Sequence, residues 1–196
     1  MGIRVEYRGA RPSAGLICSN HLSYLDILSY AAVTPCIFVS RSDVRKWPVF
    51  GACARWSGTL FIDRQSRVST EVTTRQMEDA LNAGVPILLF PEGTSTDGSS
   101  VLRFHPSLLE PAVRQGREIA AAAIGYHVDR GEERDICWYG DAGFLPHLLR
   151  TMGRKGVLSE IEFYPGPGVY ADRKAAALDL HDKVEAIRSR MRPATR

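Results

Sequence analysis

Short apolar runs alternate with longer amphipathic stretches along most of the chain. The apolar runs are bounded by glycine or polar residues, and they predict strands at 15–19, 36–40, 58–63 and 85–90. The stretches at 23–33 and 69–83 place apolar residues three or four positions apart and predict helices, with Ser69 as the cap and Gly84 as the stop of the second. Strands separated by helices predict an α/β fold with a substantially parallel sheet.

The rest of the chain adds two strands and a long helix to this pattern. Residues 118–126 are apolar enough for a strand, although their alanines favour helix. Residues 160–166 have the pattern of an edge strand ended by proline, and residues 172–191 that of an amphipathic helix covering the sheet. No repeat or linker interrupts residues 1–196, so we expect a single domain: a mixed, mostly parallel sheet flanked by helices.

Composition narrows the class of protein further. The chain has 196 residues, 44% of them apolar, and both signs of charge are mixed throughout, which excludes a disordered chain. The apolar runs are far shorter than a bilayer span, and the N-terminus lacks the pattern of a signal peptide. The net charge of +3 is too small to favour nucleic acid as a partner. The four cysteines lack the spacing of a metal site, and we expect reduced thiols.

Polar clusters follow three of the predicted strands. Asn20 and His21 come after the first strand, Arg64 after the third, and Glu92-Gly93-Thr94 after the fourth. Ligands of open α/β sheets bind at the carboxyl ends of the strands. If the three strands are parallel, His21, Asp26, Arg64 and Glu92 meet in one crevice.

The stretch NHLSYLD allows two interpretations of His21 and Asp26. Histidine is the usual general base near neutral pH, and Asp26 is close enough in sequence to orient it and stabilise its charged form. Alternatively, Ser23 and Asp26 form a capping box at a helix start. The two roles are compatible, because a capped helix end holds a carboxylate rigidly.

The other clusters also have two interpretations each. The stretch FPEGTSTDG is either a plain turn or a site whose carboxylate and backbone N–H groups bind a ligand. Arg64 either binds a phosphate or carboxylate or pairs with Asp63 at the surface. Cys18 is not expected to act as a nucleophile, because the preceding strand buries it. No serine-hydrolase elbow, Walker loop or dinucleotide fingerprint is present.

Taken in order, NHLSYLD, GTLFIDR and VPILLFPEGTSTDG resemble the glycerolipid (lysophospholipid) acyltransferase family, which includes bacterial 1-acylglycerol-3-phosphate acyltransferases. The resemblance covers residues 15–125, and the later stretch CWYGDAGFLPHLLR resembles the ornithine-lipid branch of the family. It implies a glycerol-phosphate acyltransferase-like fold and the transfer of a fatty acyl group from acyl-CoA or acyl-carrier protein to the hydroxyl of a lysophospholipid such as 1-acylglycerol-3-phosphate. Alternatives are a lyso-aminolipid acceptor of the ornithine-lipid type and a catalytically silent module that binds lipid or acyl-carrier protein.

The resemblance also implies roles for the residues at the strand ends. His21 would be the general base and Asp26 its orienting carboxylate, with no metal and no bound cofactor. The expected contacts to the acceptor come from Arg64, Glu92, Gly93 and Thr94, with Asn20 and Ser23 in support. Phosphate-recognising members often carry arginine where this chain has Ser95, which leaves the acceptor open.

Access to a lipid substrate requires contact with a membrane. We expect peripheral binding to an anionic membrane, on the cytoplasmic side of the inner membrane, without a transmembrane segment. The stretch 41–56 combines basic residues with tryptophan and phenylalanine and is the candidate surface. The alternative is a solvated loop whose tryptophans pack inward.

Overall fold

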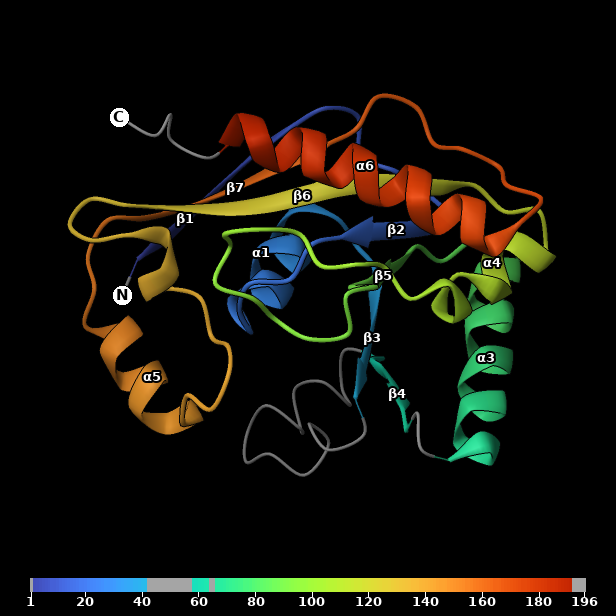
Figure 1. Cartoon of the computed structure of the whole chain (residues 1–196), viewed down its shortest axis with the longest axis horizontal. Helices are drawn as coiled ribbons and strands as arrows, with labels where there is room; N and C mark the ends of the chain where they lie inside the picture. Colours follow the sequence, from blue (N-terminus) through green and yellow to red (C-terminus); the bar gives the residue numbers. More distant parts are fainter. Residues whose placement is uncertain (1, 42–57, 64–65, 192–196) are drawn as a thin grey trace.

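In the part of the chain that the structure describes, seven strands form one sheet with helices on both faces (Figure 1). The computed structural model describes residues 2–41, 58–63 and 66–191. The strands are β1 (Ile3–Arg8), β2 (Leu16–Ser19), β3 (Ile37–Arg41), β4 (Leu60–Ile62), β5 (Ile87–Leu89), β6 (Ile119–Val128) and β7 (Val157–Phe163). The α-helices are α1 (Leu25–Val33), α3 (Arg67–Asn82), α4 (Glu110–Arg114), α5 (Phe144–Met152) and α6 (Arg173–Met191), with short 3-10 helices η2 (Pro106–Leu108) and η3 (Glu133–Asp135).

The sheet has the order β1-β7-β6-β2-β5-β3-β4. All neighbouring strands run parallel except β6 and β7, which are antiparallel. The predicted fold class, a mixed and mostly parallel sheet flanked by helices, is confirmed. The alanine-rich run predicted as a strand is the long, buried β6, which lies between β7 and β2.

The central strand β2 separates two apolar cores. Leu16 and Cys18 point into the core formed with α3 and α6, whereas Ile17 points into the core that α1 covers. Alternate residues of a strand face opposite sides of its sheet, so three apolar residues in a row, Leu16 to Cys18, are buried without a polar face. Figure 1 shows α6 and α1 on opposite sides of the sheet.

One prediction about the edges of the sheet was wrong, and one edge strand was missed. The stretch predicted as an edge strand at 160–166 is β7 (Val157–Phe163), which lies between β6 and β1 and is largely buried. The edge is β1, which the pattern did not predict as a strand. Arginine and glutamate alternate with its apolar residues, and most of β1 is exposed, so it lacks the continuous apolar run of the internal strands.

The start of α3 also differs from the prediction. The cap is Ser66 rather than Ser69, because the Ser66 hydroxyl accepts the backbone N–H of Ser69 at 3.2 Å. Ser69 lies inside the first turn, and its hydroxyl oxygen accepts the N–H of Asp63. Gly84 follows the helix with φ +73°, a left-handed conformation that favours glycine, as expected of a helix stop. Within the described ranges no helix is long and apolar enough to cross a bilayer.

Candidate active site

The turns that follow β2 and β5 lie together at one edge of the sheet. The two strands are parallel neighbours with Cys18 opposite Leu89, so both end at the same edge of the sheet. The backbone N–H of His21 donates to Glu92 Oε1 at 2.8 Å, which joins the two turns directly. The structure therefore brings His21, Asp26 and Glu92 together. Arg64, the fourth residue expected here, lies outside the described residues.

His21 and Asp26 form a close pair. Nδ1 of His21 lies 2.7 Å from Oδ2 of Asp26, whose side chain is fully buried, while 21% of the His21 side chain is exposed. The imidazole also stacks on Phe90, with ring centroids 4.1 Å apart. A proton on Nδ1 donated to Asp26 leaves the lone pair of Nε2 available, which is the tautomer that a general base needs.

Asp26 accepts hydrogen bonds from four groups. Its Oδ2 receives the Nδ1–H of His21 and the backbone N–H groups of Leu22 and Ser23, at 2.7 and 3.0 Å respectively. Its Oδ1 receives the hydroxyl of Tyr126 at 2.5 Å. All four of these groups are donors, an arrangement suited to a carboxylate anion. Tyr126 was missed by the sequence analysis, because 100 residues separate it from Asp26.

The capping interpretation of this turn is half right. The carboxylate of Asp26 accepts the Ser23 N–H, as a capping box requires. However, α1 begins at Leu25 after Tyr24, which makes no side-chain cap. Among the described residues the buried hydroxyl of Ser23 has no hydrogen-bond partner, so Ser23 does not cap the helix.

The stretch after β5 is both a turn and part of the candidate site. The N–H of Gly93 donates to the carbonyl of Phe90 at 3.1 Å, with Pro91 and Glu92 between them, and Gly93 has φ +76°. Both carboxylate oxygens of Glu92 accept backbone amides: Oε1 that of His21 and Oε2 that of Leu102, at 2.8 Å each. Burial raises the pKa of Glu92 to about 7. Glu92 thus holds two loops in place, and its expected contact with the acceptor stays a prediction.

The next residues tie this turn to the turn of His21. The N–H of Thr96 donates to the carbonyl of His21 at 2.9 Å. The Ser95 hydroxyl donates to the backbone carbonyl of Trp138. The backbone N–H of Trp138 donates in turn to the carbonyl of Leu22. Thr94 is exposed beside them and is open to a ligand.

Asn20 joins the end of β2 to β6. Its side-chain amide donates to the carbonyl of Ile124 at 3.0 Å and accepts the N–H of the same residue at 2.9 Å. This paired bond holds the residue before His21 against β6. The supporting role expected of Asn20 stays a prediction.

Cys18 lies at the end of β2 but points away from this chemistry. It is fully buried in the core, and burial raises the pKa of its thiol far above the ordinary range. No cluster of three or more histidine, cysteine or acidic side chains suited to a metal ion occurs among the residues that the structure describes.

Comparison with known proteins identifies the family of this chain. The family profile described as Acyltransferase matches residues 3–125. The chain is 31% identical to the 1-acyl-sn-glycerol-3-phosphate acyltransferase of Neisseria gonorrhoeae, over 78% of this chain and 60% of the relative. It is 36% identical to the lyso-ornithine lipid O-acyltransferase of Pseudomonas aeruginosa, over 92% of this chain and 70% of the relative.

A solved structure has the same fold. The crystal structure of PlsC, the 1-acyl-sn-glycerophosphate acyltransferase of Thermotoga maritima, superposes with a TM-score of 0.66 at 18% identity, covering 98% of this chain and 74% of that one. The chain spans 60% of the length of the Neisseria gonorrhoeae relative and of the enzyme with the same name from Neisseria meningitidis. Because the profile matches well over half of the sequence, the chain belongs to the acyltransferase family.

Proposed function

We propose that this protein transfers a fatty acyl group from a thioester, acyl-CoA or acyl-carrier protein, to the hydroxyl of a lysolipid. The observation that carries the proposal is the partly exposed imidazole of His21, held through Nδ1 by the buried carboxylate of Asp26. Family membership supplies the reaction class. The acyl donor acts as a substrate, and the mechanism invokes no metal or resident cofactor.

In this mechanism His21 is the general base and Asp26 orients it. Nε2 takes the proton of the acceptor hydroxyl while that oxygen attacks the thioester carbonyl. The carbon–sulfur bond then breaks, and the imidazolium returns the proton to the departing thiolate. Asp26 stabilises the imidazolium, as in a serine hydrolase, but the lipid hydroxyl replaces the enzyme serine.

The oxyanion of the tetrahedral intermediate needs a separate donor. The backbone N–H groups of Leu22 and Ser23 already donate to Asp26, and that of His21 donates to Glu92. These three amides are therefore assigned to holding the pair in place rather than to the oxyanion.

Two acceptors are supported by different observations. The three motif blocks favour 1-acylglycerol-3-phosphate. In this assignment Arg64 binds the phosphate, and Glu92, Gly93 and Thr94 contact the rest of the acceptor. Similarity to lyso-ornithine lipid O-acyltransferases extends over 92% of the chain in the Pseudomonas relative, which favours a lyso-aminolipid. Arg64→Ala separates the two acceptors: it raises the KM of a phosphorylated acceptor selectively if the first assignment is right.

Peripheral contact with an anionic membrane, on the cytoplasmic side of the inner membrane, belongs to the same proposal. The proposed acceptors reside in a bilayer, so the site must open toward it. The stretch 41–56, expected to make this contact, lies almost entirely outside the described residues.

Product analysis tests the proposal. The protein is incubated with acyl-CoA or acyl-carrier protein and a panel containing 1-acylglycerol-3-phosphate and lyso-ornithine lipid, and the products are identified by mass spectrometry. Acylated lipid is the expected result. Free fatty acid instead identifies a thioester hydrolase, and no turnover with any pair identifies a silent binding module.

A further inference from the structure

Tyr126 places a buried hydroxyl on the far side of the candidate general-base pair. Strand β6 pairs with β2 only as far as Ser19, which lies opposite Ala122, and then continues beyond the end of β2. This extension carries Tyr126 over the turn that follows β2. The ring is 3% exposed, and the hydroxyl donates to Oδ1 of Asp26 at 2.5 Å.

We infer that Tyr126 is a positioning residue of this site, acting on His21 through Asp26; the inference rests on the proposed function. Nothing in the motif blocks points to this residue, which lies immediately after the part of the chain that the family profile matches. The argument depends on how the two carboxylate oxygens divide their partners.

The three donors to Oδ2 come from the turn between β2 and α1, which is His21 itself and the next two residues. Oδ1 accepts the hydroxyl of Tyr126, which belongs to a different element, β6. The bond to Tyr126 therefore fixes the rotation of the carboxylate about its Cβ–Cγ bond relative to the sheet. Without it, Oδ1 is a buried acceptor lacking this partner, and the carboxylate can rotate together with the imidazole that it holds, which moves Nε2 out of place.

Tyr126 is itself held firmly. Its backbone N–H donates to Glu133 Oε1 at 2.8 Å. The guanidinium of Arg188 binds both oxygens of Glu133, at 3.1 and 2.7 Å, and also donates to the carbonyl of Ile124. A donor fixed in this way can set the position of Asp26 rather than follow it. Burial and the nearby Asp26 carboxylate raise the pKa of Tyr126, so the hydroxyl stays a donor across the working range.

A matched control lies in the same core. Tyr30 is also fully buried, and its hydroxyl donates to the Ser19 hydroxyl at 2.7 Å instead of to Asp26. Tyr30→Phe removes an equally buried hydroxyl without touching the carboxylate. A purely structural role of Tyr126 predicts similar effects of Tyr126→Phe and Tyr30→Phe on activity.

We expect Tyr126→Phe to lower kcat by about tenfold while KM changes by less than about twofold, and Tyr30→Phe to leave both near the wild-type values. Among the described residues, the titratable groups around His21 are Asp26 and Glu92, with Tyr126, Tyr30 and Cys137 behind Asp26. A carboxylate that has lost one donor attracts the imidazole proton more strongly. The acid limb of the kcat/KM profile should therefore move to higher pH in Tyr126→Phe alone.

A double-mutant cycle makes the test specific. Because Tyr126 acts through Asp26, Tyr126→Phe should add little to the loss caused by Asp26→Asn. Equal effects of Tyr126→Phe and Tyr30→Phe, or full additivity with Asp26→Asn, would overturn the inference.

Two further measurements keep the test decisive. If Tyr126→Phe does not fold, fluorotyrosine at position 126 keeps the shape but donates more strongly, and the acid limb should then move to lower pH; an unmoved limb counts against the inference. If the wild-type protein transfers no acyl group, the proposed function fails. The Nδ1–H proton resonance of His21 still reports the contact, and it should shift in Tyr126→Phe but not in Tyr30→Phe.

Discussion

At the scale of the residue, one buried carboxylate organises the candidate site. Asp26 holds the backbone of its own turn through the amides of Leu22 and Ser23, and the same oxygen holds the imidazole of His21. Structural and chemical roles are therefore combined in one group. Asp26→Asn should reduce turnover and stability together, since an amide cannot accept from all of these donors.

Glu92 provides a pH-dependent prediction at the same scale. Burial raises its pKa to about 7, above the ordinary 4.5 that it regains on unfolding. The folded protein therefore binds this proton more tightly, and the contribution of Glu92 to the free energy of unfolding is full below pH 4.5 and is lost as the pH rises through about 7.

Glu92→Gln removes this titration. Between pH 5 and pH 8 the wild type should lose on the order of 2 kcal/mol of stability relative to Glu92→Gln, measured by denaturant unfolding at each pH. Parallel stability curves for the two proteins would contradict this prediction.

Much of the residue-scale site was predictable, because its members lie at strand ends in short, recognisable stretches. His21, Asp26 and Glu92 were placed together from the sequence, and the structure brings them together. The engagement of both Glu92 oxygens by backbone amides was not predictable, since it depends on the path of the loop through Leu102.

At the scale of the element, a buried ion pair joins α6 to β6 and η3. The guanidinium of Arg188 is 1% exposed and pairs with Glu133, and it also donates to the carbonyl of Gly98 at 3.2 Å. Gly125 leaves space for it, since a Cβ there would lie 2.6 Å from Nη1 of Arg188. The helix is thereby fixed to the strand that carries Tyr126.

Arg188→Met should lower the free energy of unfolding by about 3 to 5 kcal/mol, because it leaves Glu133 partly buried without its cation. The control is Arg173→Met on the same helix, which breaks an exposed ion pair with Glu110 and should cost less than about 1 kcal/mol. Denaturant unfolding compares the two variants. Equal losses in the free energy of unfolding would show that the buried pair stabilises the fold no more than the exposed pair does.

The elements themselves were predictable where burial is uniform. The strands β2 and β5 have continuous apolar runs, and α6 has an apolar face, so each of these three patterns had one interpretation. β1 and α5 were not predicted, because both expose much of their length and α5 has Pro146 in its first turn. The pairing of Arg188 with Glu133 depends on tertiary contacts across 55 residues.

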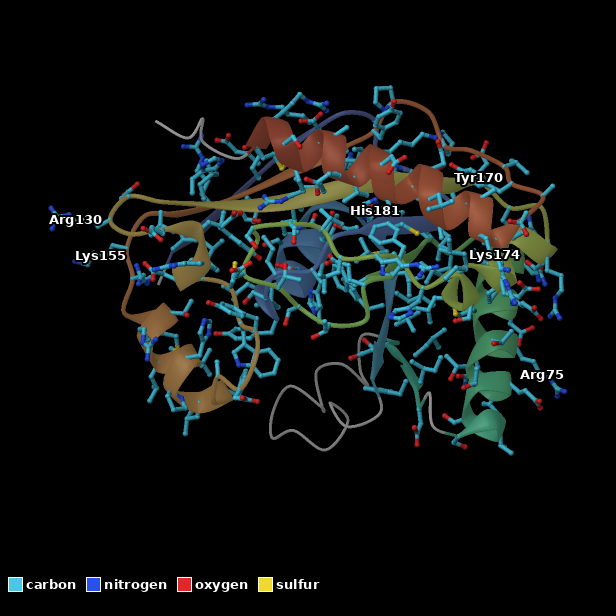
Figure 2. All side chains as sticks on the ribbon, viewed as in Figure 1. Arg75, Arg130, Lys155, Tyr170, Lys174 and His181 are labelled. Atoms are coloured by element: carbon cyan, nitrogen blue, oxygen red, sulfur yellow. The ribbon has the colours of Figure 1, made fainter. Side chains whose placement is uncertain are left out.

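At the scale of the molecule, α5 joins the candidate site to an exposed apolar surface. The ring of Tyr24, in the turn after His21, packs edge-on against Phe144 and His147 of α5. The opposite face of α5 exposes Leu145, Leu149 and Met152 at 61%, 61% and 51%. Arg130 and Lys155 extend from the same end of the molecule as this helix (Figure 2).

A lipid surface suits this face, because the proposed acceptors must be reached in a bilayer. The double substitution Leu145→Glu and Leu149→Glu should weaken binding to anionic vesicles by about tenfold or more, measured by vesicle sedimentation. Leu178→Glu on α6, a leucine exposed to 65%, is the control and should bind as the wild type does. Unchanged vesicle binding would contradict this prediction. Conversion of a dimer to a monomer by the double substitution would instead assign the face to contact with a second copy of the chain.

The central claim is that His21 is the base of an acyl transfer, and the rate of acyl-lipid formation tests it directly. His21→Ala should lose about 10²- to 10⁴-fold in kcat while its unfolding transition stays near that of the wild type. His127→Ala, which removes a half-exposed histidine paired with Glu160, should keep wild-type activity. Near-normal turnover by His21→Ala, or an equal loss in His127→Ala, would contradict the account.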